Sequence, residues 1–585
     1  MSGLSSPGSS TSTLQEPTRV HTLLQESLRR DEIRAEQYGG DDPQDPLPKQ
    51  GDILPPSKEV YSLDPALVGW DGPNDPENPQ NWSSRKKWAT TILSVLMTVN
   101  VTFASSAPSG ASTAIATEFG VNTEVGYLVT SIFLCGYVVG PLLWGPGSEL
   151  FGRRIIFRIG LAVYVILHLG QALANNMTTL LVTRFLTGVF ACAPLTIGGG
   201  VIVDIWDPIT RGTATAIFSA GVFVGPVLGP IVGGFVIQSS LGWRWIFWIM
   251  MIFAGFCTVL AFLFLPETYA PVLLQWKAER LRKADPKANA QLYAEHERSD
   301  WSFTGVLHRT LYRPVQMLIR EPILLLITIY ISLVYGVLYA MFEAIPYIFI
   351  TTRGFNSGEA GLVFVGVGVG TTIGAYLTIP LSKHYPKLIV KYRGFPPPEE
   401  RLYGAMIGGV MLVIGAFWLG WTGEYARIHW IVPALATVPI GAAVALVFNG
   451  FLAYLVDTYL QYAASAFSAN TIVRSCVGAA FPLFTVQMFS ALGISWACTL
   501  VGLCGLLLAP SPFLFYKYGP RIRAKSKFSP CPDLAIAKAI AEEEAAAAAK
   551  GEAQAKRVPP LLVSVWFPGT TLPAFDDDHR LASCT

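Results

Sequence analysis

The chain has 585 residues, of which 51% are hydrophobic and 14% are charged, and its formal net charge is +2. An average soluble domain has roughly 25% charged residues, so this chain is too apolar to cover an ordinary globular surface and is expected to lie in a membrane. Its basic residues form short clusters between apolar runs instead of one basic domain, and we therefore expect no nucleic-acid partner.

The first segment, residues 1–87, is rich in Ser, Pro, Asp, Glu and Gln. It contains no apolar core of signal-peptide length. We interpret it as a disordered cytosolic tail, and we expect the first spanning helix itself to direct insertion into the membrane.

Apolar runs of roughly 18 to 25 residues, the length that crosses a bilayer, recur between residues 88 and 518. A charged connection, residues 266–321, separates an N-terminal half, residues 88–265, from a C-terminal half, residues 322–518, and residues 519–585 are expected to form a cytosolic tail. The expected fold is an all-α membrane protein with twelve transmembrane helices in two six-helix halves. The expected spans are 88–108, 125–147, 155–174, 180–203, 212–238, 245–265, 322–349, 359–381, 402–421, 429–454, 464–491 and 495–516.

Lys and Arg gather in alternate loops, and such loops face the cytosol. The outer loops hold only Arg244, Arg353 and Arg427, which predicts that both termini are cytosolic. This orientation places the sequon at Asn176 outside, where glycosylation is possible. The basic residues of the inner loops are Arg153, Arg154, Arg158, Arg211, those of residues 277–320, Lys383, Lys387, Lys391, Arg393 and Arg401.

The loop between the second and third spans reads GPGSELFGRR, with Gly145, Glu149, Gly152, Arg153 and Arg154 as its marked positions. Glycines permit a tight turn at the membrane face, and the acid and the two arginines offer charges that can pair across the ends of neighbouring helices. A simpler interpretation is that any cytosolic loop can contain GRR. The ordered spacing favours a specific loop.

The fourth span contains a charge, Arg184, with Gly188 one turn later. A charge at the centre of a spanning helix costs about 2.5 to 3.5 kcal/mol, so Arg184 is expected to face the bundle interior and to have a function. The alternatives are a snorkelling side chain or a static ion pair.

The fifth span reads GVFVGPVLGPIVGGFV. Residues four apart advance only about 40° around a helix, so its glycines form a groove that lets another helix approach closely, while its prolines bend or stiffen the segment. The residues of this pattern are Gly221, Gly225, Pro226, Gly229, Pro230, Gly233 and Gly234.

Further ionisable residues lie in later spans, and with Arg184 they are the candidates for proton coupling: Glu343, Asp457 and Arg474. Glu343 could bind a proton or a cationic substrate, and Asp457 either pairs with Arg474 or is a charge at the cytosolic end of its helix. Aromatic side chains suit flat apolar or cationic compounds. The substrate cavity is expected to draw on Phe342, Glu343, Tyr347, Phe349 and Phe481.

The sequence resembles the major facilitator superfamily, and within it the fungal twelve-span drug:proton antiporters that include multidrug and polyamine exporters. The loop at 145–154 and the fifth-span glycines carry the resemblance, together with DPENPQNW at 75–82, LPETYAPVLLQWKAERLRK after the sixth span, FEAIPYIF, PEERL and FPLF. The resemblance implies that Arg184 and Gly188 serve proton coupling, that the fifth-span pattern is an antiporter motif, and that the halves alternate in exposing one central site.

The expected function is proton-coupled efflux of small organic compounds such as drugs, toxins or polyamines at the plasma membrane. No phosphate-binding loop is present, the histidines are scattered and the cysteines lack zinc-site spacing, so we expect no enzyme activity, cofactor or metal. The expected partners are the substrate, protons and the lipid bilayer, with the monomer as the active form. The rivals are a proton symporter or facilitator that imports a nutrient and a non-transporting sensor on the same scaffold.

Overall fold

The computed structural model describes residues 66–72, 74–207, 211–298, 302, 304–305 and 308–557. Within these residues twelve helices are long and apolar enough to cross a membrane, which confirms the predicted fold class. The chain divides into two compact units, 1–534 and 535–585, and the first contains every one of these spans. In the second unit the described residues continue one helix, α21 (Pro532–Arg557).

The first six spans form the N-terminal half. The first is longer than expected, because α2 (Ser84–Ser106) continues through a short 3-10 turn, η2 (Ser109–Ala111), into α3 (Ser112–Phe119). The other five are α4 (Thr123–Phe151), α5 (Arg153–Ala172), α6 (Met177–Ile205), α7 (Arg211–Gln238) and α8 (Arg244–Phe264).

The connection between the halves, which we call the linker, contains α9 (Ala270–Ala284) and α11 (Arg313–Arg320). The last six spans form the C-terminal half. They are α12 (Pro322–Pro346) with η5 (Tyr347–Thr351), α13 (Ser357–Leu362) with α14 (Phe364–Leu381), α16 (Tyr403–Gly423), α17 (Ile431–Tyr459), α18 (Ala463–Leu492), and α19 (Ile494–Leu508) with α20 (Ser511–Arg523).

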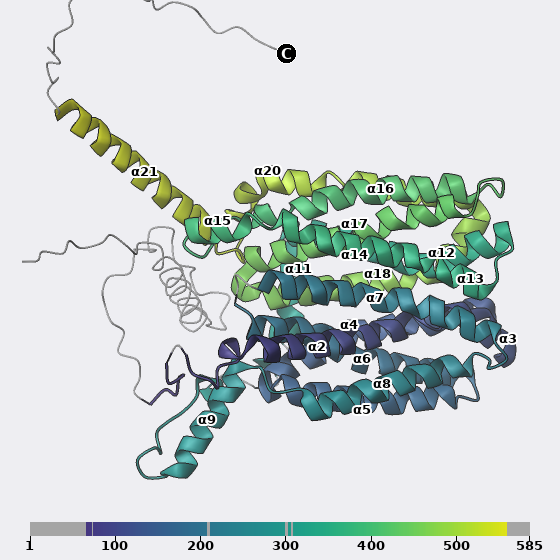
Figure 1. Cartoon of the computed structure of the whole chain (residues 1–585), viewed down its shortest axis with the longest axis horizontal. Helices are drawn as coiled ribbons and strands as arrows, with labels where there is room; N and C mark the ends of the chain where they lie inside the picture. Colours follow the sequence, from purple (N-terminus) through teal and green to yellow (C-terminus); the bar gives the residue numbers. More distant parts are fainter. Residues whose placement is uncertain are drawn as a thin grey trace, which may run out of the picture. The chain divides into compact units, whose positions relative to one another are not determined.

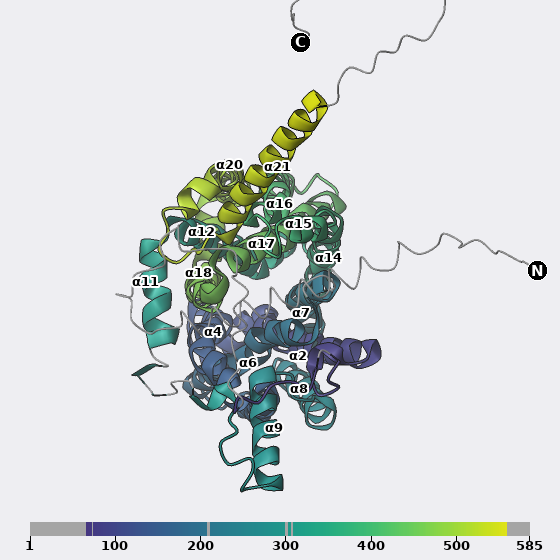
Figure 2. The same cartoon turned by 90° about the vertical axis from the view of Figure 1, so that its left-hand side faces the viewer.

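The spanning helices lie side by side in two groups, which are the two halves (Figures 1 and 2). Between the groups, α4 packs against α18 and α7 packs against α13 and α14. We call the end of the bundle that carries Asn176 and lies opposite the linker the distal end.

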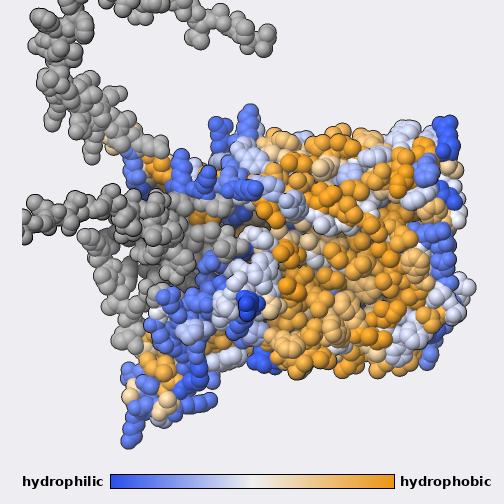
Figure 3. Space-filling model, viewed as in Figure 1, coloured by the Kyte–Doolittle hydropathy of each residue, from blue (hydrophilic) through white to orange (hydrophobic). Residues whose placement is uncertain are grey.

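On the face drawn in Figure 3, apolar side chains form a belt across the middle of the bundle, with polar side chains toward both ends. Large apolar side chains point outward along this belt, among them Leu507, which is 81% exposed, and Leu263, which is 67% exposed. Such a surface is unfavourable in water and favourable in hydrocarbon, so the belt is the lipid-facing surface of the protein.

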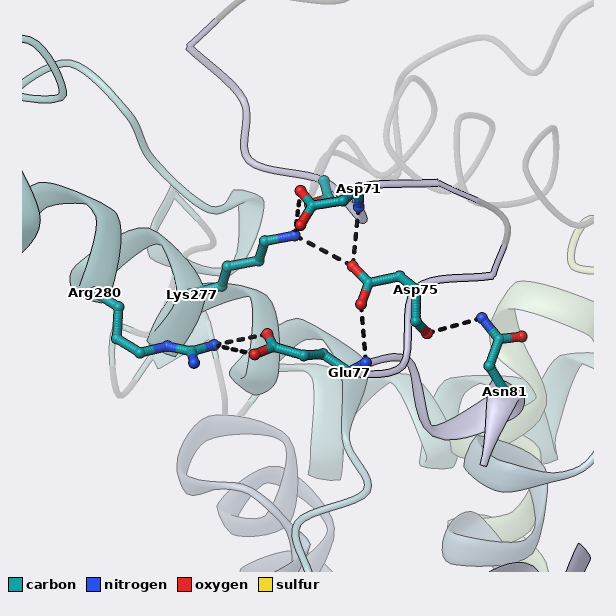
Figure 4. A network of polar contacts seen from close by, with 7 residues as sticks. Asp71, Asp75, Glu77, Asn81, Lys277 and Arg280 are labelled. Atoms are coloured by element: carbon teal, nitrogen blue, oxygen red, sulfur yellow. Dashed lines mark hydrogen bonds and ion pairs between the residues drawn. The ribbon is translucent and has the colours of Figure 1, made fainter. Parts of the chain in front are cut away.

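The segment before the first span is held against the linker by ion pairs (Figure 4). The Lys277 ammonium on α9 contacts a carboxylate oxygen of Asp71 at 2.7 Å and one of Asp75 at 3.3 Å, and Arg280 contacts Glu77 at 2.6 Å. Asp75 also accepts hydrogen bonds from the backbone N–H groups of Asp71 and Glu77 and, through its backbone carbonyl, from Asn81.

These contacts perturb the two best-buried members of the network. The hydrogen bond from the Asp71 backbone, with those from Glu77 and Lys277, lowers the pKa of Asp75 against the opposing effect of burial. For Lys277, burial opposes the charge, but the hydrogen bonds to Asp71 and Asp75 outweigh it and raise the pKa. Two motifs that are far apart in the sequence, DPENPQNW and the segment after the sixth span, therefore form one structural unit.

The expected tails are shorter than predicted at their inner ends. Residues 84–87 of the expected tail begin α2, and Asp71, Asp75 and Glu77 before it pair with the linker; residues 1–65 and 73 lie outside the described residues. At the other end, the Arg523 guanidinium contacts Glu399 at 2.9 Å and Asp533 at 2.8 Å, which holds the chain to the C-terminal half up to residue 533. Composition alone does not reveal ion pairs between distant segments.

Candidate functional site

The glycines of α7 face α2 at backbone distance. A Cβ on Gly229 would overlap the Ser106 hydroxyl and lie 2.7 Å from the Ala107 nitrogen, and a Cβ on Gly225 would lie 2.6 Å from the Phe103 nitrogen. Gly233 similarly meets the Ala107 carbonyl, and Gly221 meets the Val95 side chain. The partner in the expected groove is therefore the first span of the same half.

The opposite side of α7 meets the other half. A Cβ on Gly234 would overlap the Ser357 carbonyl at the start of α13, and a Cβ on Gly361 of α13 would lie 2.7 Å from the Pro230 carbonyl. Both prolines of the pattern, Pro226 and Pro230, are buried inside the helix. Small residues occur on two sides of α7. The helix therefore approaches the backbone of α2 on one side and that of the C-terminal half on the other.

Arg184 is fully buried on α6 and is held by backbone groups. Its Nε donates to the Val129 carbonyl of α4 at 2.9 Å, its Nη1 donates to the Ala104 carbonyl of α2 at 3.0 Å, and its guanidinium lies 4.4 Å from the centre of the Phe133 ring. Its Nη2 has no hydrogen-bond partner. Among the described residues no carboxylate forms an ion pair with it, so its fork joins three helices of one half.

Gly188 explains how α4 and α6 come so close. A Cβ on Gly188 would overlap the Phe133 carbonyl, and a Cβ on Gly136 of α4 would lie 2.5 Å from the Val189 nitrogen. The glycine one turn after Arg184 is therefore the packing site that brings the α4 carbonyls within reach of the guanidinium.

The expected tight turn in the loop at 145–154 is confined to its end. Helix α4 continues to Phe151, and of its glycines only Gly152, with φ of 88°, makes a turn that favours glycine. The Arg153 guanidinium pairs with Asp204 of α6 at 3.2 Å, donates to the Ser148 hydroxyl at 2.6 Å and lies 4.6 Å from the centre of the Tyr269 ring. Glu149 interacts electrostatically with Arg153 as a further acid.

Glu267, in the segment after the sixth span, completes this loop. Its carboxylate accepts hydrogen bonds from the backbone N–H groups of Arg153 at 2.9 Å and Arg154 at 3.0 Å, at the start of α5. A Cβ on Gly152 would lie 2.8 Å from the carboxyl carbon, so the glycine is required for this approach. The sequence analysis did not identify Asp204 or Glu267 as members of this loop. Glu267 is the acid of the PETYAP motif, and this motif was the one sequence signal that pointed to it.

We expect Glu267→Ala to lower the thermal unfolding midpoint of the purified protein clearly. The substitution leaves two N–H groups at the start of α5 without acceptors, which costs on the order of 1 to 3 kcal/mol, and removes a negative charge from a helix N-terminus. Glu267→Gln keeps one acceptor oxygen and should have a smaller effect. A midpoint unchanged by Glu267→Ala, within the scatter of the surface variant Glu542→Ala, would show that this contact does not stabilise the loop.

Two ionisable side chains near the contact between the halves lack charge partners among the described residues. Glu343 of α12 is 6% exposed, its buried Oε1 accepts no hydrogen bond, and Tyr127 of α4 interacts with it electrostatically. Arg474 of α18 makes no hydrogen bond or ion pair; its guanidinium lies 5.2 Å from the centre of the Tyr335 ring and 4.7 Å from that of Phe448.

Asp457 does not pair with Arg474. It forms an ion pair with Arg401 at 2.8 Å and accepts a hydrogen bond from the Tyr385 hydroxyl, at the linker end of α17. Burial opposes the charge of Arg401, but the attraction of Asp457 outweighs it and raises the pKa of Arg401. Of the two interpretations of Asp457, the structure therefore agrees with a charge at the end of its helix.

The aromatic candidates are spread along the bundle. Phe342 is buried against Tyr339 and Phe364, and Phe481 covers Gly336 on α12. Tyr347 and Phe349 instead lie in η5 at the distal end, where Tyr347 packs against Phe489 and Phe349 packs against Phe355. The structure does not bring these two into the space around Arg474.

The remaining candidates concern modification and metal. Asn176 lies in the α5–α6 loop at the distal end, where its side chain accepts a hydrogen bond from the Thr179 backbone and so caps α6. Within the described residues no group of three His, Cys, Asp or Glu side chains is arranged to hold a metal ion.

A twelve-helix membrane bundle with unpaired ionisable groups between two halves has the architecture of a membrane transporter. Residues 93–482 match the family model described as Major Facilitator Superfamily. The chain belongs to this superfamily, and it is a transporter and not an enzyme.

Named relatives support the same assignment. The citrinin biosynthesis cluster transporter mrr1 of Monascus ruber is 46% identical over 81% of this chain and 95% of its own length. The multidrug transporter mdrA of Aspergillus fumigatus is 40% identical over 82% of this chain and 78% of its own length. The resemblance to fungal members of the superfamily, predicted from the motifs, is confirmed by these relatives.

The fold has counterparts among solved structures. The proton:xylose symporter XylE bound to 6-bromo-6-deoxy-D-glucose superposes with a TM-score of 0.55 and 19% sequence identity, over 75% of this chain and 96% of that protein. At this identity the similarity concerns the fold alone.

Proposed function

We propose that this protein exports small organic compounds from the cytosol in exchange for protons, by alternating access at the plasma membrane with both termini cytosolic. The observation that carries the proposal is the packing of α7, whose glycines contact α2 on one side and α13 on the other. Relative movement of the halves must pass through this contact, and close backbone packing keeps it sealed against leaks.

Two further observations support an exchange mechanism. Cross-half hydrogen bonds lie near the middle and the distal end: Tyr339 donates to Ser105 at 3.0 Å, and Gln487 donates to Glu124 at 3.1 Å. Breaking them would open the distal side. Glu343 lies on the same helix as Tyr339 and its Oε1 accepts no hydrogen bond, which supports it as the group that gains or loses a proton as these contacts change.

The test uses inside-out vesicles, whose lumen corresponds to the cell exterior. With an acidic lumen, vesicles containing the protein should accumulate carboxyfluorescein or rhodamine 123, and a protonophore should abolish the accumulation. Glu343→Gln, which cannot ionise, should bind dye but lose the dependence on the pH gradient, whereas Arg427→Gln, in an exposed outer loop, should behave as wild type.

The direction of the response separates the candidate functions. Release of preloaded dye from the lumen under the same gradient would indicate a symporter that imports its substrate. Accumulation that is the same with and without the gradient would exclude proton coupling. If Glu343→Gln keeps the full dependence on the gradient, Glu343 is not the coupling group.

A further inference from the structure

Arg474 is a cation in the middle of a spanning helix without a charge partner. It lies eleven residues into α18, about 16 Å from the start of the helix, which is too deep for the side chain to reach the membrane surface. It makes no hydrogen bond or ion pair to any described residue, and its Nε is buried without an acceptor. An unpaired charge inside a spanning helix is energetically unfavourable, and such residues usually have a function.

The surroundings of Arg474 place it inside the protein and not against lipid. The rings of Tyr335 on α12 and Phe448 on α17 come from its own half, and Cys192 on α6 and Tyr137 on α4 interact with it from the other half. Nevertheless Arg474 stays partly exposed, while Tyr335 and Phe448 are buried. The side chain of Arg474 therefore lies between the halves, and part of it stays accessible.

The geometry leaves one side of the guanidinium free. Aromatic rings attract a guanidinium through its flat face, so they do not use its N–H groups, which point outward in the plane of the fork. Two parallel N–H donors match the two oxygens of a carboxylate, and such charge-assisted pairs are strong in a site that excludes water.

Arg184 provides the contrast within the same molecule. It also lies over an aromatic ring, but it is fully buried and two of its nitrogens donate to backbone carbonyls of neighbouring helices. Its fork is used by the fold, whereas the fork of Arg474 is unused. Arg184 therefore joins helices, whereas the N–H groups of Arg474 have no acceptor among the described residues.

We propose that Arg474 binds the anionic group of the transported compound, and that the substrates are aromatic carboxylates or similar planar oxyanions. The compound's ring system would lie among the aromatic side chains beside the arginine. This inference rests on the proposed export function, because it identifies the substrate class of that site. Glu343 lies eight residues beyond Tyr335 on α12, about 12 Å away along the helix, and so remains separate from the anion.

The experiment compares two xanthene dyes of similar shape and opposite charge. Binding of carboxyfluorescein, an anionic carboxylate, and of rhodamine 123, a cationic ester, is titrated to the purified full-length protein by dye fluorescence anisotropy. We expect wild type to bind carboxyfluorescein on the order of tenfold or more tightly than rhodamine 123, because a buried charged hydrogen bond distinguishes them.

Substitutions at Arg474 supply the decisive comparison. Arg474→Gln should weaken carboxyfluorescein binding on the order of tenfold or more and leave rhodamine 123 binding unchanged or tighter. Arg474→Lys keeps the charge but loses the fork, and should give an intermediate affinity for the anionic dye. Arg427→Gln is the matched control, because it removes an arginine from an exposed loop. Unfolding midpoints of all variants are measured, since a folding defect would reduce binding of both dyes.

Each outcome decides one question. Preference of wild type for rhodamine 123, absence of carboxyfluorescein binding, or equal loss of both dyes in a folded Arg474→Gln protein would overturn the anion site. If rhodamine 123 accumulates in the vesicles under the pH gradient while the anion site fails, the export function stands without this substrate class. If carboxyfluorescein binds through Arg474 but never moves with the gradient, the site stands and the export function fails.

Discussion

Gly229→Val is expected to abolish dye accumulation under a pH gradient. A branched side chain at this position has to displace the Ser106 hydroxyl and the Ala107 backbone nitrogen, which would lie 2.7 Å from its first carbon. A backbone cannot move aside as a flexible side chain does, so α7 would separate from α2. We expect loss of transport with the protein still present in the membrane, because each spanning helix inserts through its own apolar surface.

The measurement is the gradient-driven accumulation per amount of protein in the vesicle membrane. Gly229→Ala should reduce accumulation only in part, because the alanine methyl group overlaps α2 at the same place but with fewer atoms than the valine side chain. The matched control is Gly212→Val in the same helix, since a Cβ at Gly212 has no neighbour within 4 Å. Accumulation by Gly229→Val equal to that of Gly212→Val would show that close packing between α7 and α2 is not needed.

The fifth span shows what sequence periodicity can and cannot predict. Four-residue spacing of glycines fixes which face of a helix is thin, and the structure places Gly225 and Gly229 on such a face. The spacing does not identify the partner, because any helix can enter a thin groove. That α2 fills one side and α13 approaches the other depends on the arrangement of all twelve spans.

The loop at 145–154 shows a second limit. The residue types predicted a charged loop with a glycine turn, and the turn is present at Gly152. Its partners, Asp204 and Glu267, lie 51 and 114 residues from Arg153 in the chain. Pairing at such separations follows from helix packing and leaves no periodic signal in the sequence. The same reason explains why composition predicted a disordered tail where Asp75 pairs with Lys277.

Arg184→Lys is expected to keep the fold but to abolish uphill efflux. Lysine retains a positive charge but has one nitrogen in place of the planar fork, so it cannot donate to the Val129 and Ala104 carbonyls in the same geometry and also lie flat over Phe133. Because these carbonyls belong to α4 and α2, losing one of the bonds loosens the junction of three helices. If the arrangement of these helices sets the response to protons, coupling fails while substrate binding remains and downhill leak persists.

Arg184→Ala is expected to have a second, larger effect on the protein itself. It removes the Arg184 donors from both carbonyls, at a cost of about 1 to 3 kcal/mol for the Ala104 carbonyl, since Pro108 four residues later has no N–H to offer, and it creates a cavity beside Phe133. We therefore expect a lower unfolding midpoint and less protein in the membrane, in addition to the loss of efflux. Arg427→Lys and Arg427→Ala, at the exposed loop, serve as controls for loss of an arginine.

The two substitutions separate coupling from a purely structural role when two measurements are compared in the same preparation. These are dye accumulation in inside-out vesicles with an acidic lumen, which reports efflux, and equilibrium dye binding. Loss of gradient-driven efflux in Arg184→Lys, with binding and abundance retained, would place Arg184 in the coupling mechanism. Full efflux by Arg184→Lys would mean that a static charge is sufficient and that the fork is dispensable. Normal efflux by Arg184→Ala would remove Arg184 from the mechanism, because neither the charge nor the junction of α2, α4 and α6 would then be needed for exchange.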